Sequence, residues 1–317
     1  PHLEVCTTQL QKDIWRYCRY TGAMPYSDYV GRRMRFLIRD KSLPSHPIMG
    51  IAAIGSSVMQ VRDRDNWIGW NEDNREIKKK RIANMMDLYV SISIPPYNEL
   101  LTGKLICYMM VSNEVREIYR KKYEGKKTIM KGREVTDIVL LATTTLYGLH
   151  CSQYNRLKYT DDTYKDLLLY IPVGETAGFG SMHITDAQFN RMREYLQKKG
   201  IDLSYRFGDG ANWRMRVIKE YYDQRGWDSE KGLNHGYKRG VYVAPLAKNC
   251  KEFLRGETDN IDYYDFPNDS MVNYWKERWL KNRIVADPST RREKAEPMAR
   301  LFSFKKNSIK ISELLDC

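Results

Sequence analysis

The stretch MMDLYVSISIPPYNELLTGKLICYMMVSNEVREIYRKKY, residues 85–123, decides the fold class. Its first ten residues are apolar and β-branched, which predicts a strand that stops at Pro95-Pro96. Residues 101–123 then have the apolar periodicity of a helix. Lys and Arg gather near its C-terminus, where positive charges interact favourably with the negative end of the helix dipole. A strand, a turn and a helix in this order predict an α/β protein.

Other segments repeat this alternation of strands and helices. We expect strands at 47–61, 137–146, 164–171 and 241–245. We expect helices at 3–20, 186–199, 211–224, 248–254 and 269–283, and a short helix that carries Tyr154.

The charge of the chain favours an anionic partner. The sequence has 53 Lys and Arg against 40 Asp and Glu, a net charge of +13, together with 23 Tyr and 7 Trp. Such a field attracts polyanions, and aromatic rings beside cations can stack on unpaired bases. Nucleic acid is therefore the expected partner, ahead of a basic protein whose tyrosines only pack its core.

Cysteine usage and hydropathy exclude several classes of protein. No two of the six cysteines form a C-x-x-C pair and only five histidines are present, so neither a zinc site nor a disulfide framework is expected. Free thiols fit the cytoplasm. No apolar run approaches the length of a membrane helix, and no signal peptide is visible.

The helix start after Pro95-Pro96 is a candidate phosphate site. Backbone N–H groups at a helix N-terminus bind anions, so Asn98, Gly103, Lys104 and Leu105 are candidate cofactor ligands. The segment is not a Walker A loop, because Asn98 and Leu105 stand where that motif needs Gly and Ser or Thr.

The order of strand, loop, helix and strand resembles the acetyl-coenzyme-A-dependent N-acyltransferase (GNAT) fold. The resemblance implies coenzyme A or another nucleotide-containing acyl donor at residues 98–105. It also implies that Tyr154 protonates the leaving thiolate and that a carboxylate deprotonates the amine. The alternative is a common structural unit in which Tyr154 belongs to the core.

Two charged segments carry further candidate residues. RDRDNWIGW, residues 62–70, reads as a strand and turn with Arg62 and Arg64 on one face and Asp63 and Asp65 on the other. Asp65 could then be a general base, although the segment could equally be a structural turn with its tryptophans buried. FGDGANWRMR, residues 207–216, places glycines before a helix start, which is typical of an anion site. The candidate nucleic-acid-binding residues are Arg62, Arg64, Trp67, Trp70, Arg214, Arg216, Arg239 and Lys276.

Several longer segments resemble the DruA-type family found in Druantia anti-phage systems. They are RRMRFLIRD (32–40), residues 49–71 with the most specific box RDNWIGW, the strand and helix at 85–123, residues 138–157, NWRMR (212–216), NHGYKRGVY (234–242) and WKERWLKNR (275–283). The resemblance implies a GNAT-like mixed, largely antiparallel sheet flanked by helices, and a mainly helical C-terminal region. The expected parts are an N-terminal helix (1–24), a GNAT-like core (25–180), a helical basic region (181–285) and a basic tail (286–317).

Three functions follow, in order of preference. The first is a nucleic-acid-binding, GNAT-like component of an anti-phage system, which binds DNA rather than RNA and acts with a helicase or other defence proteins. The second is an acyl-donor-dependent transferase that modifies nucleic acid or a target bound to it. The third is a metal-dependent nuclease built on Asp65, Glu76 and Lys78, but the same Glu-x-Lys tripeptide recurs at 124–126 and Glu76 lies in a charged stretch.

Overall fold

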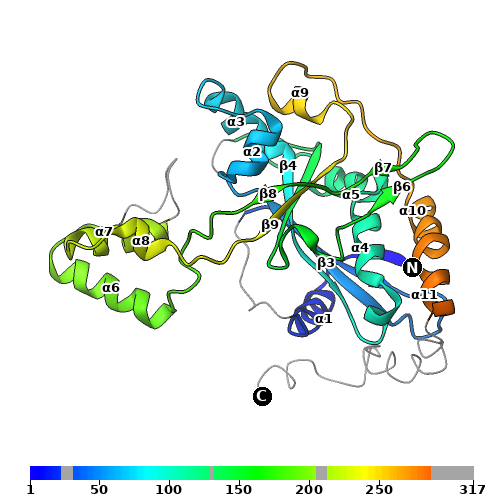
Figure 1. Ribbon diagram of the computed structural model, residues 1–317, viewed down its shortest axis with the longest axis horizontal. Coiled ribbons are helices and arrows are strands. Elements are labelled where there is room, and N and C mark those ends of the chain that lie inside the picture. The colour runs from blue at the N-terminus through cyan, green and yellow to red at the C-terminus, as the bar shows by residue number, and fades with distance from the viewer. Residues whose placement is uncertain (23–30, 129–131, 205–212, 287–317) are drawn as a thin grey trace.

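The computed structural model describes residues 1–22, 31–128, 132–204 and 213–286 (Figure 1). Its main sheet has the strand order β1-β2-β3-β4-β5-β9-β8, and β4 and β5 are parallel while the other neighbours are antiparallel. The strands are β1 (His2–Val5), β2 (Arg33–Arg39), β3 (Ile48–Ser56), β4 (Met85–Ser93), β5 (Leu140–Thr145), β9 (Gly240–Pro245) and β8 (Ile171–Glu175). A separate two-stranded sheet pairs β6 (Lys158–Tyr159) with β7 (Leu167–Leu168). The expected α/β class, with a largely antiparallel sheet flanked by helices, is confirmed.

Helices cover both faces of the sheet because its strands alternate apolar side chains between the two faces. On one face Phe36, Leu141 and Tyr242 pack against α4 (Thr102–Met110), α5 (Asn113–Tyr123) and α10 (Asn268–Trp275). On the other face, α1 (Gln9–Arg19) covers β2, β3 and β4. On this second face, α2 (Arg62–Ile68) and α9 (Cys250–Leu254) cover β5 and β9, and α3 (Arg75–Arg81) lies beside these two helices.

The N-terminal segment is not one helix from residue 3. Strand β1 first pairs with β2, and α1 starts only after Thr8. The Thr8 hydroxyl accepts from the Gln11 amide while the Gln11 side chain accepts from the Thr8 amide, a reciprocal cap that fixes the helix start. Local capping and strand pairing therefore override the helical periodicity of residues 3–8.

The expected helix at 101–123 is divided in two. Ser112 has an extended backbone, with φ −68° and ψ 161°, between α4 and α5. The Asn113 amide donates to the carbonyl of Phe266 at 2.9 Å, and the Asn113 side chain accepts from the Phe266 amide at 2.9 Å. This distant segment supplies the hydrogen bonds that a continuous helix would have made within itself.

Strand β9 lies between β5 and β8, so the sheet includes residues on both sides of the boundary expected at 180. Between β8 and β9 the chain forms a small helical insert of α6 (Asp186–Lys198), α7 (Trp213–Gln224) and α8 (Ser229–Leu233), which projects from the sheet (Figure 1). The insert has its own core around Leu196 and Ile218. The C-terminal helix continues from α10 through a π-helical turn, Lys276–Leu280, into α11 (Lys281–Ala286). Residues 207–212 of the expected anion site and the tail beyond residue 286 lie outside the described residues.

Candidate functional site

The parallel strands β4 and β5 separate and enclose a cavity. They pair over three positions, from Met85 with Leu140 to Asp87 with Ala142. Beyond these pairs the facing edges of the two strands, Leu88–Ser93 and Thr143–Thr145, line a cavity of about 590 Å³. The split places backbone groups of both strands, together with their side chains, around one open volume.

Tyr154 contributes to the wall of this cavity. It lies in a turn, with its amide 3.1 Å from the Cys151 carbonyl, and not on the expected helix. Its ring stacks on Tyr170 with 5.4 Å between centroids, and its hydroxyl is 3.4 Å from the Thr143 hydroxyl. Burial raises the pKa of Tyr154 well above its ordinary value, so the hydroxyl stays protonated and can donate a hydrogen bond.

Arginines give the cavity a positive charge. Arg19, Arg35 and Arg239 line it, and the described lining residues include no Asp or Glu. The guanidinium of Arg35 lies 4.7 Å from the centre of the Trp15 ring, which holds it against the wall. Arg239 is the one residue of the expected nucleic-acid set that reaches this cavity. This positive charge favours an anionic ligand. The described lining residues offer no carboxylate that could act as a general base.

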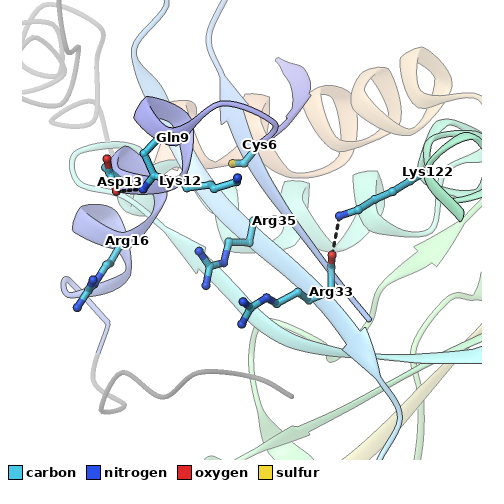
Figure 2. Close-up of a pocket in the computed structure, with 8 residues that line it drawn as sticks. All are labelled: Cys6, Gln9, Lys12, Asp13, Arg16, Arg33, Arg35 and Lys122. Atoms are coloured by element: carbon cyan, nitrogen blue, oxygen red, sulfur yellow. Dashed lines mark hydrogen bonds between the residues drawn. The ribbon is translucent and has the colours of Figure 1, made fainter. Parts of the chain in front are cut away.

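A basic groove adjoins the cavity on the face that carries α1 (Figure 2). The groove has a volume of about 460 Å³ and is lined by Lys12 and Arg16 of α1, Arg33 and Arg35 of β2, and Lys122 of α5, with Asp13 as a carboxylate of its lining. Arg35 lines both spaces, so the groove and the cavity are neighbours.

The cations of the groove lie close enough to affect one another. The Lys122 ammonium donates to the carbonyl of Arg33 at 2.7 Å. Burial lowers the pKa of Lys122, and the neighbouring charges of Lys126, Lys12 and Arg33 lower it further. A bound anion would relieve this repulsion.

Two sequence patterns point to this groove. Arg33 and Arg35 alternate on one face of a strand, and Lys12 and Arg16 are four residues apart on one face of a helix. The alignment of these patterns with each other and with Lys122 depends on tertiary contacts.

Residues 98–105 make contacts within the protein. The Lys104 ammonium donates to the carbonyls of Ser152 and Asn155, and burial lowers the pKa of Lys104 to about 8. The carbonyl of Leu101 accepts from the Trp275 indole at 3.2 Å. Leu105 is fully buried, Asn98 is exposed, and Gly103 lies against the side chain of Gln153. Lys104 is turned toward protein carbonyls, so phosphate contacts at this helix start would rest on backbone N–H groups.

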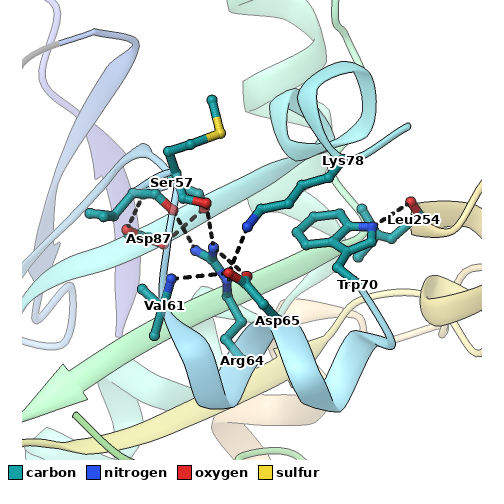
Figure 3. A network of polar contacts seen from close by, with 10 residues as sticks. Ser57, Val61, Arg64, Asp65, Trp70, Lys78, Asp87 and Leu254 are labelled. Atoms are coloured by element: carbon teal, nitrogen blue, oxygen red, sulfur yellow. Dashed lines mark hydrogen bonds and ion pairs between the residues drawn. The ribbon is translucent and has the colours of Figure 1, made fainter. Parts of the chain in front are cut away.

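The RDRDNWIGW segment forms helix α2, and the expected strand was wrong. Gly69, with φ +92°, ends the helix in the left-handed conformation that glycine favours, and its amide donates to the Asp65 carbonyl at 3.0 Å. Asp65 is 7% exposed and accepts from Arg64 at 2.6 Å and from Lys78 at 2.7 Å (Figure 3). Asp65 is therefore the counter-ion of a buried network and does not line the cavity.

Two residues of the expected nucleic-acid set are buried in this region. Arg64 has no exposed surface, and the Trp70 indole donates to the carbonyl of Leu254 at 3.0 Å. Both side chains hold α2 on the protein and are inaccessible to a nucleic acid in this conformation.

The remaining expected residues lie on separate elements. Arg62 is exposed on α2, and Trp67 is half-buried with the Lys251 ammonium 4.1 Å from its ring centre. In the helical insert, Arg214 forms an ion pair with Asp186 at 2.8 Å and Arg216 is half-buried. Lys276 is half-buried on the C-terminal helix. The structure does not bring α2, α7 and this helix together (Figure 1).

The residues considered for a nuclease do not form a site. Lys78 binds Asp65, whereas Glu76 is exposed and pairs with Lys79 at 2.9 Å. In the described part of the chain, no three His, Cys, Asp or Glu side chains gather as metal ligands. Its five cysteines are buried free thiols. No helix in the described ranges has both the length and the apolar character needed to cross a bilayer.

Comparison with known proteins identifies the family. The family described as Druantia protein DruA matches residues 1–256. The Druantia protein DruA of Escherichia coli (strain UMEA 4076-1) is 33% identical over 303 residues, which cover 94% of this chain and 71% of that protein. No solved structure matches the chain significantly. The chain therefore belongs to the DruA family of Druantia proteins.

Proposed function

We propose that this protein is a cytoplasmic, nucleic-acid-binding component of a Druantia anti-phage defence system. DruA proteins are components of such systems. The observation that carries nucleic-acid binding is the basic groove, where five Lys and Arg side chains from α1, β2 and α5 line one concave surface and Asp13 is the only carboxylate among the described lining residues. DNA is the expected ligand, and a helicase or another defence protein is the expected partner.

The physical basis is the release of counterions from a polyanion. Each phosphate neutralised by Lys or Arg releases condensed cations, so the logarithm of affinity falls with the logarithm of salt concentration by about 0.9 for each phosphate contact in duplex DNA. A groove with five cations that meets four or five phosphates would give a slope of about −4.

The test is a salt titration of binding by fluorescence anisotropy with duplex DNA, single-stranded DNA and RNA. We expect the double variant Lys12→Ala/Arg33→Ala to weaken binding and to reduce the magnitude of the slope by about 2. The matched control is Lys231→Ala/Lys248→Ala, which removes two exposed cations from other surfaces. Equal losses in both double variants, or wild-type binding that is insensitive to salt, would contradict the proposal.

The second candidate is the acyl-donor-dependent transferase. The strand order with one parallel pair in the main sheet, and the position of Tyr154 at the cavity where that pair separates, support a GNAT-like core. We rank this candidate second because the Lys104 side chain is turned inward and the described cavity-lining residues include no carboxylate.

Calorimetric titration with coenzyme A and with acetyl-coenzyme A tests this candidate. Saturable binding that is competed by nucleic acid, or acetyl transfer that is lost in Tyr154→Phe, would place the transferase first. An absence of binding to both compounds would remove it.

A further inference from the structure

We propose that the cavity between β4 and β5 receives one base of a nucleic-acid strand, turned out of its stack, while the basic groove holds the adjoining phosphates. This inference rests on the nucleic-acid binding proposed above and specifies how the strand is bound. It makes the cavity a site for an unpaired nucleotide.

The adjacency of the two spaces is the first argument. Arg35 lines both, and α1 borders both, with Lys12 and Arg16 in the groove and Trp15 and Arg19 in the cavity. Figure 2 shows the residues of the groove. A strand whose phosphates follow the groove would therefore bring a nucleotide to the mouth of the cavity. Arg19 and Arg239 add positive charge to the lining of the cavity itself.

The size and the walls of the cavity are the second argument. Its volume of about 590 Å³ lies within the range of small-molecule sites, roughly 300 to 1,000 Å³. Tyr89, Tyr147 and Tyr154 are aromatic lining residues, and Tyr147 is 76% exposed. Aromatic side chains stack on bases of any sequence, and an exposed ring is available for this.

The polar groups of the cavity suit the edge of a base. Ser91, Thr145 and Gln153 line it, together with the backbone edges of the two separated strands. Hydroxyl, amide and backbone groups can donate to and accept from a base edge. An acidic peptide could also meet these strand edges, but the continuous groove of cations beside the cavity favours a ligand with phosphates at regular intervals.

The experiment compares three duplexes of one sequence: fully paired, with a one-base bulge, and with an abasic nucleotide as the bulge. An already unpaired base spares the protein the cost of unpairing and unstacking. We expect the bulged duplex to bind about tenfold more tightly than the paired duplex, and the abasic duplex to lose this preference.

The cavity is tested with Thr144→Trp, which places a large side chain at an exposed position of the lining. This variant should bind paired duplex with the wild-type affinity and salt slope and lose the preference for the bulge. Thr163→Trp, at an exposed loop position outside the lining, is the matched control and should keep the preference. The groove variant Lys12→Ala/Arg33→Ala should weaken binding of both duplexes equally.

A second measurement does not depend on the folding of Thr144→Trp. A 5-iodouracil base in the bulge should cross-link on irradiation to Tyr89, Tyr147 or Tyr154, as mapped by mass spectrometry. Cross-links confined to other residues would overturn the proposal.

Further outcomes separate this inference from the proposed function. Salt-dependent binding through the groove without a bulge preference in the wild type overturns the cavity site and leaves the proposed function intact. No binding of any duplex removes both. Stronger competition by dAMP alone, or by an acidic peptide, than by the bulged duplex would show a free nucleotide or a peptide site instead.

Discussion

The hydroxyl of Thr143 donates a hydrogen bond to the carbonyl of Leu88 at 2.8 Å, one position beyond the last backbone pair of β4 and β5. A side chain thus replaces the backbone ladder at the point where the two parallel strands separate. Thr143 is only 5% exposed, so the bond lies in a protected environment at the base of the cavity. The relationship marks where sheet structure ends and the candidate site begins.

Replacing Thr143 with Val should destabilise the protein. Valine keeps the shape of threonine but leaves the Leu88 carbonyl without this donor, which costs about 1 to 2 kcal/mol of unfolding free energy. Thr144→Val is the control, because residue 144 is exposed and should change stability by less than about 0.5 kcal/mol. Urea unfolding measures both, and equal stability of the two variants would show that the hydrogen bond is unimportant.

Asp65→Asn should be a stability variant. It removes the negative charge that compensates the buried Arg64 and the nearly buried Lys78, and breaking such an ion pair costs about 3 to 5 kcal/mol. Glu76→Gln breaks an exposed pair and should cost less than about 1 kcal/mol. Chemical denaturation compares them, and a full-stability Asp65→Asn protein would refute the role of Asp65 as a structural counter-ion.

Lys104 should make stability depend on pH in the alkaline range. Burial lowers its pKa in the folded protein to about 8 from 10.5, so between these values the unfolded chain binds a proton that the folded protein has released. The contribution of Lys104 to the unfolding free energy therefore increases as pH rises through this window.

The measurement is the urea midpoint of wild type and Lys104→Met at several pH values between 7.5 and 10.5. The stability of wild type relative to the variant should increase with pH. A relative stability that is constant or that decreases would mean that the pKa of Lys104 is not lowered.

The helical insert should be removable without unfolding the sheet. The chain enters and leaves it at one point, where the Gly180 amide donates to the Leu233 carbonyl at 2.9 Å and the His235 amide donates to the Gly178 carbonyl at 2.9 Å. A short glycine-serine linker in place of residues 181–233 can therefore join β8 to β9.

The shortened protein should retain cooperative thermal unfolding, measured by circular dichroism. It should bind duplex DNA through the groove with the wild-type salt slope. A protein that folds but has lost this binding would show that the insert, and not the groove, carries the nucleic acid.

Local elements were predictable where the sequence signal is itself local. Strand β4 and its end before Pro95-Pro96, strand β9 and helix α6 follow from apolar patterning and from proline. The segment at 62–70 misled because its alternating charges also fit a helix with acidic residues in its first turn and glycine at its end. Burial of Arg64 and Asp65 decided between the two.

The candidate site depended on contacts that sequence spacing does not show. Arg33 and Arg35 share a face of β2, but Lys12 precedes them on α1 and Lys122 follows on α5. They line one groove because α1 packs on β2 and the end of α5 reaches the Arg33 carbonyl. Likewise Lys104, a candidate phosphate ligand by its position at a helix start, is drawn inward by the carbonyls of Ser152 and Asn155.

The sequence by itself determined the α/β class, the main strands and helices, the positive charge and the likeness to the DruA family, because these depend on composition and short-range periodicity. The tertiary structure decided which charges are neutralised within the protein and which line a common surface. It buried the Asp65 network and gathered the groove beside the split of β4 and β5. Electrostatic interactions depend on distance and burial in three dimensions, so neither outcome is determined by the order of residues along the chain.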